Sequence, residues 1–313
     1  MTTQATRPVL LITGAGGMVG RNLLDHPDIA GWQVLAPSSR DLDLCDKAAT
    51  EAWIARHRPD AVIHAAGLVG GIQANLAQPV RFLTANTEMG LNLVQACRQA
   101  GVGTLINLAS SCMYPRDLGD GLAEDLVLTG MLEPTNEGYA LAKIVTMRLC
   151  QYAMREDPDL AYKTLIPCNL YGKWDKFDPA RSHLIPAIIH KVHQAQVTGA
   201  PTVEIWGDGT ARREFMYAGD LADAVMRALA DPAALPDTLN IGPGHDHSIN
   251  DYYAAVARVI GWQGSFVHDL DRPVGMKRKL LDVARQTDWG WAPATTLEQG
   301  IRATYDFYQE HHA

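Results

Sequence analysis

The sequence has 313 residues, 47% of them hydrophobic and 20% charged, and a formal net charge of -8. This length allows one large domain or two small ones with a proper core, and the negative charge excludes a basic surface for nucleic acid. Residues 1–8 lack the apolar core of a signal peptide, and no apolar run approaches the length of a membrane span. The five scattered cysteines indicate free thiols. We expect a soluble cytoplasmic protein that binds neither nucleic acid nor membranes.

A glycine-rich turn follows the first predicted strand, residues 9–12. Its three glycines form a G-x-x-G-x-x-G pattern that leads into a helical stretch, residues 21–24. Glycines permit a tight turn and close approach of the backbone, and a helix start offers free N–H groups to a pyrophosphate. A turn without a ligand is the structural alternative. The predicted cofactor contacts here are Gly14, Gly17, Met18, Val19 and Gly20.

The second predicted strand, residues 32–36, ends without the acidic residue that usually holds the ribose of NAD. Ser39 and Arg40 stand there instead, and a hydroxyl beside a guanidinium suits the 2'-phosphate of NADP. The next strand, residues 61–64, ends in Ala65, Ala66 and Gly67, whose small size lets a cofactor lie against the backbone. We therefore predict NADP(H) as the cofactor and no metal site.

Alternating strands and helices continue to about residue 170, including a helix over residues 79–100 that ends at Gly101. This alternation predicts an α/β fold with a doubly wound parallel sheet of the Rossmann type. We expect residues 1–172, with about 216–242, to form the NADP-binding domain. Residues 173–215 and 243–313 are less regular and are expected to form a smaller C-terminal substrate-binding domain.

The centre of the predicted site is the stretch from residue 109 to residue 143. Ser110 and Cys112 follow a buried strand, residues 104–108, and so lie at the carboxyl edge of the sheet, where ligands bind. Tyr139 and Lys143 are four residues apart on one helix face. An ammonium beside a phenol is expected to lower the tyrosine pKa, which makes Tyr139 a candidate proton donor and acceptor.

Five longer motifs carry a resemblance to a known family: residues 67–72, 110–115, 169–172, 182–186 and 206–215. With the glycine turn, they resemble the extended short-chain dehydrogenase/reductase superfamily and, within it, the GDP-L-fucose synthases. The resemblance extends from the turn to about residue 282. It implies an NADPH-dependent enzyme that epimerises carbons 3 and 5 of GDP-4-keto-6-deoxy-D-mannose and reduces carbon 4. Separately from the resemblance, the apolar stripes of the helical stretches 79–100 and 139–154 predict a homodimer face, with core packing as the structural alternative.

The resemblance assigns roles to individual residues. It implies a reductive triad of Ser110, Tyr139 and Lys143 and an epimerisation pair of Cys112 as base and His183 as acid. Further cofactor contacts are implied for Lys143, Leu170 and His183. The implied contacts to the GDP-linked keto-deoxy sugar are Ser111, Asn169, Lys191, Trp206 and Arg213.

Three positions depart from the family pattern. Gly16 and Lys191 stand where arginines are common, so fewer contacts to phosphate are expected. Gly138 stands where proline is usual, so a looser start of the catalytic helix is expected.

Alternative functions remain open. A sister enzyme acting on another GDP-4-keto sugar, of the colitose or deoxyheptose type, would differ in loops such as residues 173–182. A nucleotide-sugar 4-epimerase or 4,6-dehydratase with bound NAD is disfavoured, since Ser111 and Cys112 stand where a dehydratase would carry an acid pair. A non-enzymatic NADP sensor would tend to lose the tyrosine or the lysine.

Overall fold

The computed structural model describes residues 7–178, 182–272 and 277–312. Two predictions fall partly outside these ranges: the absence of a signal peptide, and the loop of residues 173–182. The chain divides into two compact units. The first comprises Met1–Met113, Leu132–Pro167 and Ala222–Leu239, and the second comprises Tyr114–Met131, Cys168–Leu221 and Asn240–Ala313.

The first unit is built around a six-stranded sheet in the order β10-β5-β4-β3-β1-β2. Its strands are β1 Val9–Thr13, β2 Gln33–Leu35, β3 Ala61–His64, β4 Thr104–Leu108, β5 Ala161–Pro167 and β10 Thr238–Ile241. Its helices are α1 Met18–Leu24, α2 Lys47–His57, α3 Ile72–Ala77, α4 Pro79–Ala100, α5 Glu137–Glu156 and most of α7 Ala218–Ala230, with the 3-10 turns η1 Pro27–Gly31 and η2 Ser111–Met113.

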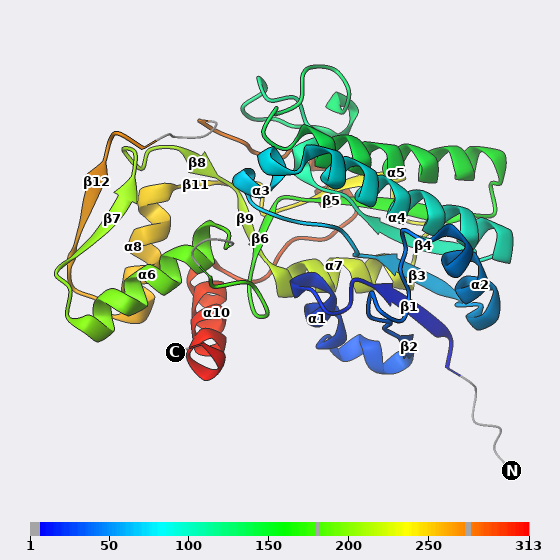
Figure 1. Cartoon of the computed structure of the whole chain (residues 1–313), viewed down its shortest axis with the longest axis horizontal. Coiled ribbons are helices and arrows are strands. Elements are labelled where there is room, and N and C mark those ends of the chain that lie inside the picture. Colours follow the sequence, from blue (N-terminus) through cyan, green and yellow to red (C-terminus); the bar gives the residue numbers. More distant parts are fainter. Residues whose placement is uncertain (1–6, 179–181, 273–276, 313) are drawn as a thin grey trace, which may run out of the picture. The chain divides into compact units, whose positions relative to one another are not determined.

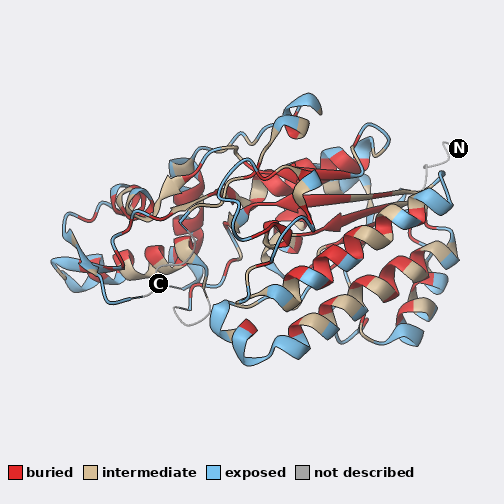
Figure 2. Ribbon diagram, turned by 90° about the horizontal axis from the view of Figure 1, so that it is seen from above, coloured by how far each residue is buried: buried red, intermediate tan, exposed pale blue. Residues whose placement is uncertain are grey.

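The sheet is doubly wound. The pairs β2–β1, β1–β3, β3–β4 and β4–β5 are parallel, and the strand order reverses between β1 and β3. Figure 1 shows α2, α4 and α5 on one face of this sheet and α1 and α7 on the other. The strands are buried on both faces (Figure 2), which explains their near-continuous apolar sequences. The predicted fold class is confirmed, and ligands of such sheets bind beyond the carboxyl ends at the reversal.

The predicted elements agree closely with the observed ones where the local pattern is strong. The bounds of β3, β4, α4 and β10 are those expected from the sequence, and Gly101 ends α4 in a left-handed conformation with φ 74°. Helix α5 starts two residues earlier than Tyr139 and α6 runs beyond Val192 to Thr198. These helix ends were less well predicted because tertiary packing, rather than local sequence, extends them.

The second unit contains short strand pairs and a helical core. Its strands form the pairs β6–β9 and β7–β12, both parallel, and β8–β11, which is antiparallel. Its strands are β6 Asn169–Tyr171, β7 Thr202–Trp206, β8 Arg212–Arg213, β9 Phe215–Tyr217, β11 His247–Ser248 and β12 Ser265–Asp269. Its helices are α6 Leu184–Thr198, α8 Ile249–Ile260, α9 Ala284–Asp288 and α10 Leu297–His311, with the 3-10 turn η3 Glu124–Leu126.

Helices α6, α8 and α10 enclose the apolar core of this unit, which includes Ile188, Val256 and Tyr308. Capping residues determine where two of these helices begin. Ser248 forms a capping box with Asp251 at the start of α8, and Thr296 does the same with Gln299 for α10. Such caps satisfy the unpaired N–H groups of the first turn and add about 1 kcal/mol each.

The segment Tyr114–Met131 groups with the second unit, whereas the sequence placed it with residues 1–172. Its backbone is held by residues far along the chain. The N–H of Leu122 donates to the Leu280 carbonyl at 3.2 Å, and the Asn240 side chain donates to the Leu122 carbonyl at 2.7 Å. These partners lie more than 100 residues away in the sequence, so no local sequence pattern predicts the contacts.

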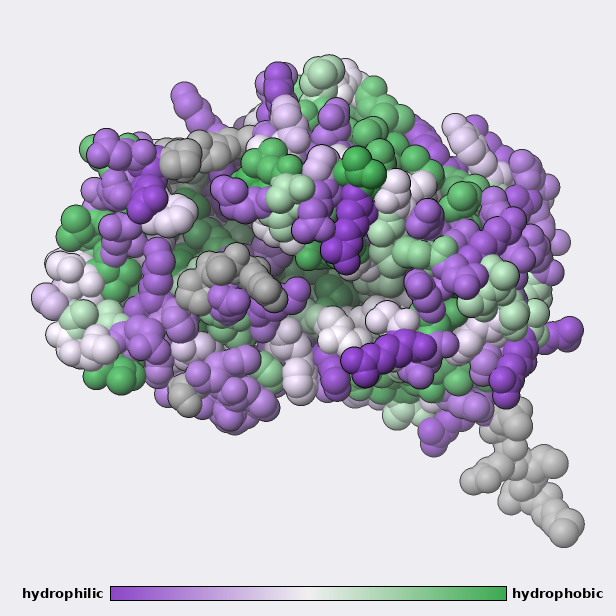
Figure 3. Space-filling model, viewed as in Figure 1, coloured by the Kyte–Doolittle hydropathy of each residue, from purple (hydrophilic) through white to green (hydrophobic). Residues whose placement is uncertain are grey.

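Polar and apolar residues are interspersed on the face seen in Figure 3. Within the described ranges, no helix is both long enough and apolar enough to cross a membrane.

Candidate active site

Ser110 and Cys112 lie just beyond the carboxyl end of β4, as predicted. The backbone N–H of Cys112 donates to Ser110 Oγ at 3.3 Å. Both side chains are half-buried, whereas the neighbouring Ser111 is buried. The short turn η2 that carries Cys112 packs against α5, and this packing brings the end of the strand to the helix that carries the other two predicted catalytic residues.

Lys143 projects from the second turn of α5 into the protein interior. Only 6% of the residue is exposed, and Nζ donates to the Leu108 carbonyl at 2.9 Å. Nζ also lies 5.8 Å from the centroid of the Tyr139 ring. Burial disfavours the charged form and lowers the pKa of Lys143 to about 8. The lysine therefore changes charge close to neutral pH.

The pKa of Tyr139 moves in the direction opposite to the one predicted. Burial raises the pKa of its hydroxyl, the neighbouring Cys112 sulfur raises it further, and a side-chain hydrogen bond with Ser110 lowers it. The expected lowering by Lys143 was wrong for this state of the protein, because Nζ is bonded to the Leu108 carbonyl and sits over the ring. Tyr139 is consequently protonated at neutral pH.

Asn136 contacts one of the predicted catalytic residues as well, although its local sequence pattern predicts no role in the site. Its Nδ2 donates to Cys112 Sγ at 3.2 Å. An asparagine directly before a helix is normally interpreted as an N-cap. The sequence pattern therefore does not predict the contact of Asn136 with Cys112.

Gly138, which stands where proline is usual in the family, is packed tightly rather than loosely. A Cβ at this position would lie 3.0 Å from the Pro79 carbonyl and 3.3 Å from the Leu83 Cβ. The first turn of α5 thus approaches the start of α4 closely, and the expectation of a looser helix start was wrong.

The glycine turn after β1 lies against the end of β3. Gly14 has φ 70°, and a Cβ on it would come within 2.7 Å of the Ala66 backbone. Thr13 joins the two strand ends, since its Oγ1 accepts from the Ala66 N–H at 3.3 Å and lies 2.9 Å from His64 Nδ1. His64 is buried, as expected of a packing residue, and burial together with Lys143 lowers its pKa to about 3.

The residues of the turn fit a dinucleotide. Gly16 is exposed, and a Cβ there would meet nothing within 4 Å, so the backbone is open to a phosphate. Ser39 and Arg40 are exposed in a turn that Asp41 holds by accepting from the Ser38 N–H and hydroxyl at 3.0 and 2.6 Å. These bonds lower the pKa of Asp41.

The end of β3 also faces the catalytic helix. A Cβ on Gly67 would lie 3.7 Å from Lys143 Nζ and 3.3 Å from Asn86 Oδ1. The small residues Ala65, Ala66 and Gly67 thus bring the backbone of this strand end close to the lysine.

The remaining predicted site residues lie in the second unit. His183 is exposed and is the residue before α6, while Lys191 lies two turns further along that helix. Lys191 Nζ lies 5.4 Å from the centroid of the Trp206 ring, and the Arg272 guanidinium lies 4.9 Å from the same ring. Trp206 is 53% exposed. An exposed indole close to two cations is suited to an aromatic base attached to phosphates.

Three more of the predicted site residues of the second unit lie in or next to the strand pair β6–β9. Asn169 is exposed in β6, and its Nδ2 donates to the Glu214 carbonyl at 2.9 Å. Leu170 is half-buried beside it, and Arg213 is half-buried in β8, where burial lowers its pKa. Cys112 and His183, the predicted epimerisation pair, therefore belong to different units.

Glu214 supports this region, and the sequence assigned it no role of its own. Its carboxylate accepts from the N–H of Gly244 at 3.1 Å and from that of Leu281 at 3.0 Å. Burial raises its pKa to about 7. Glu214 stands between Arg213 and Phe215 in the sequence, and this local pattern does not predict that its carboxylate binds two distant backbone segments.

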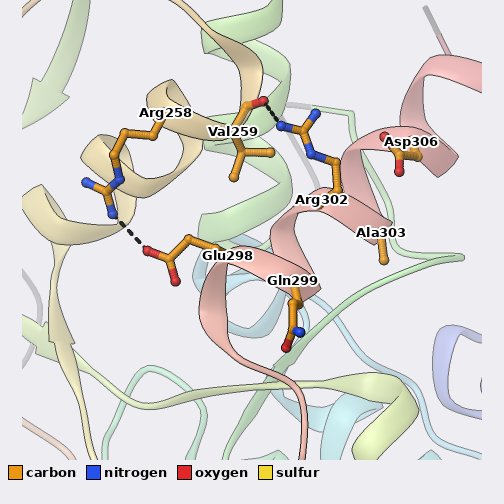
Figure 4. A pocket seen from close by; sticks show the side chains of 7 residues that line it. All are labelled: Arg258, Val259, Glu298, Gln299, Arg302, Ala303 and Asp306. Carbon is orange, nitrogen blue, oxygen red and sulfur yellow. Dashed lines mark hydrogen bonds and ion pairs between the residues drawn. The ribbon is translucent and has the colours of Figure 1, made fainter.

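A surface pocket between α8 and α10 contains none of the predicted site residues (Figure 4). Its charged side chains have partners: Arg258 pairs with Glu298 at 2.9 Å, and Arg302 donates to the Val259 carbonyl. The lining residues are Arg258, Val259, Glu298, Gln299, Arg302, Ala303 and Asp306.

Comparison with known proteins identifies the family. Residues 10–242 match the model of the NAD dependent epimerase/dehydratase family. The chain belongs to this family. It is 54% identical over 299 residues to a GDP-L-fucose synthase of Azorhizobium caulinodans, which covers 96% of this chain and 96% of that protein. It is 50% identical over 299 residues to a GDP-L-colitose synthase of Yersinia pseudotuberculosis, covering 96% and 97%.

Solved structures agree with these relatives. A GDP-6-OMe-4-keto-L-xylo-heptose reductase from C. jejuni superposes with a TM-score of 0.89 at 26% identity, over 97% of this chain and 98% of that one. A GDP-L-fucose synthetase from Naegleria fowleri bound to NADP has a TM-score of 0.87 at 25% identity, over 97% and 93%. The resemblance to the GDP-L-fucose synthases is confirmed.

Proposed function

We propose that this protein is an NADPH-dependent epimerase-reductase that converts GDP-4-keto-6-deoxy-D-mannose to GDP-L-fucose. The observation that carries the proposal is the cluster formed by Ser110, Cys112, Tyr139 and Lys143 at the carboxyl end of β4. The relation to a GDP-L-fucose synthase at 54% identity supports the choice of substrate. The first unit holds NADPH and the second binds the nucleotide sugar.

In the reductive step, bound NADPH would supply a hydride to carbon 4 of the sugar. The Ser110 hydroxyl donates a hydrogen bond to the carbonyl oxygen, and Tyr139 transfers its proton to that oxygen as charge develops there. The raised pKa of Tyr139 keeps the proton available at neutral pH. The Lys143 ammonium stabilises the phenolate that remains and would hold the cofactor ribose.

In the epimerisation steps, Cys112 acts as the base and His183 as the acid. The keto group at carbon 4 acidifies the protons on carbons 3 and 5. The Cys112 thiolate removes one of these protons, and His183 returns a proton to the opposite face, so that the configuration inverts. His183 is exposed and half-buried Cys112 is accessible to a ligand, as both roles require.

The nucleotide sugar binds to side chains of the second unit. Lys191 and Arg213 bind the diphosphate, and Trp206 stacks on the guanine. Ser111, Asn169, Leu170 and His183 complete the contacts to sugar and cofactor as the family pattern implies.

A second candidate substrate is a GDP-4-keto-3,6-dideoxy sugar that leads to GDP-L-colitose. The relative that favours it is the GDP-L-colitose synthase of Yersinia pseudotuberculosis, at 50% identity. Because colitose is a 3,6-dideoxy sugar, its carbon 3 carries no hydroxyl, and only carbon 5 requires inversion. The same cluster could perform that reaction.

The decisive experiment mixes the protein with NADPH and GDP-4-keto-6-deoxy-mannose in heavy water, following cofactor absorbance and deuterium at carbons 3 and 5. NADPH consumption with deuterium at both carbons in GDP-L-fucose supports the proposal. Consumption without deuterium would mean a plain reductase. Turnover only with the 3,6-dideoxy substrate would identify the colitose reaction instead.

We also propose that the protein is a cytoplasmic homodimer. Leu141, Val145 and Tyr152 lie along one face of α5 and are 36%, 43% and 50% exposed. Such a stripe of apolar side chains on a catalytic helix suits a contact with a second copy. Light scattering should give the mass of a dimer, and Val145→Glu should give a monomer. A monomeric wild-type protein would refute this assignment.

A further inference from the structure

The side chain of Asn136 contacts the sulfur of Cys112. Nδ2 donates to Sγ at 3.2 Å, and the turn η2 that carries Cys112 packs against α5. Cys112 is half-buried, so its sulfur can meet both a ligand and this amide.

The side chain of Asn136 does not cap the helix that the residue precedes, although its backbone carbonyl accepts from the Ala140 N–H. An asparagine at this position normally accepts a hydrogen bond from a backbone N–H of the first turn. Here it has φ -144° and ψ 21° and makes no such bond. Its Oδ1 is buried and has no hydrogen-bond partner among the described residues. The only described contact of the amide is therefore the one with sulfur, and a helix cap does not explain why the residue is an asparagine.

An amide donor distinguishes between the two forms of a cysteine. A hydrogen bond from N–H to a charged acceptor is about twice as strong as one to a neutral acceptor, so the contact favours the thiolate over the thiol. The amide carries no charge that could compete with a substrate. The titratable group that interacts electrostatically with Cys112 among the described residues is Tyr139, which stays protonated.

We propose that Asn136 is a positioning residue that holds Cys112 as a thiolate and aims it at the sugar. This inference rests on the proposed function, which makes Cys112 the base. One helix start then carries the residue that activates the base and, one and two turns later, Tyr139 and Lys143.

The test measures alkylation of Cys112 by iodoacetamide from pH 6 to pH 10, with each modified peptide quantified by mass spectrometry. Iodoacetamide is uncharged and reacts with thiolates only. The variants are Asn136→Asp, which keeps the shape but removes the donor, and Asn136→Ala. Cys112→Ser identifies the peptide. Cys45, the other half-buried cysteine, reports on folding within each sample.

The expected result is a rate at pH 7 about tenfold lower in Asn136→Ala, and lower still in Asn136→Asp, with an unchanged plateau at high pH. Cys45 should react alike in all proteins. Equal rates at pH 7 in wild type and Asn136→Asp would overturn the inference. A fall by the same factor at every pH would also overturn it, since that reports lost access rather than lost ionisation.

This outcome is separate from the proposed function, because alkylation uses no sugar and no NADPH. A protein that fails to oxidise NADPH with GDP-4-keto sugars refutes the proposed function and leaves the alkylation result interpretable. A normal turnover with an unchanged alkylation profile refutes only the role of Asn136.

Discussion

The two units hold their functional side chains in different ways. In the first, Lys143 is 6% exposed and bonded to a strand-end carbonyl, and burial alters the pKa values of both Lys143 and Tyr139. In the second, His183 is exposed and Trp206 is 53% exposed between two cations. Under the proposed function, the first unit carries a prearranged chemical group and the second a recognition surface that a ligand completes.

Tyr139→Phe should have the largest effect, because it removes the proton donor and leaves the buried packing of the ring. We expect NADPH oxidation with GDP-4-keto-6-deoxy-mannose to fall by about 10²–10⁴-fold, with KM for the sugar nucleotide little changed. Steady-state absorbance measurements test this. A variant that retains full reduction would show that the first unit is not a prearranged catalytic group.

Lys143→Met should change how stability depends on pH. The folded pKa of about 8 lies below the ordinary 10.5, so between these values the unfolded chain binds more protons and the wild type gains stability as pH rises. Below pH 8, Lys143 is protonated in both the folded and the unfolded state, so the folded state bears the full free-energy cost of burying its charge. The gain should reach the order of 1 kcal/mol per pH unit between pH 8 and 10.

Urea unfolding of wild type and Lys143→Met at several pH values measures this gain. The difference between the two proteins isolates Lys143 from cysteines and tyrosines that titrate in the same range. A difference that stays constant from pH 8 to 10 would mean that the lysine is not desolvated in the folded state.

Trp206→Ala should affect binding and leave the chemical step intact. Cation–π contacts at exposed sites contribute about 0.5–1 kcal/mol, so we expect KM for the nucleotide sugar to rise a few-fold while kcat stays near the wild-type value. Val267→Ala, at another exposed apolar position of the second unit, serves as the matched control. A loss of kcat in Trp206→Ala would contradict the division between chemistry and recognition.

Gly16→Arg should have the smallest effect, and it should be a gain. The position is exposed, and a Cβ there meets no atom within 4 Å, so the side chain fits without strain. An added guanidinium on the glycine turn should strengthen NADPH binding a few-fold relative to NADH. Fluorescence titration with both cofactors measures the ratio. An unchanged ratio would place the 2'-phosphate away from this turn.

The amino-acid sequence determines most of the local framework of this site. The G-x-x-G-x-x-G turn after β1, the strand-end Ser110 and Cys112, and the four-residue spacing of Tyr139 and Lys143 all follow from local patterns, and the structure has these residues where they were expected. Local patterns suffice here because helix and strand geometry fixes which neighbours share a face or an edge.

Other features of the site depend on tertiary structure and do not follow from local sequence patterns. The amide of Asn136 turns to Cys112 instead of capping its helix, and Glu214 binds two distant N–H groups. The pKa of Tyr139 rises where proximity to Lys143 predicted a fall. Each of these depends on which distant groups remove water from a side chain or offer it a partner. Desolvation acts over the whole folded volume, so the spacing of residues along the chain does not encode it.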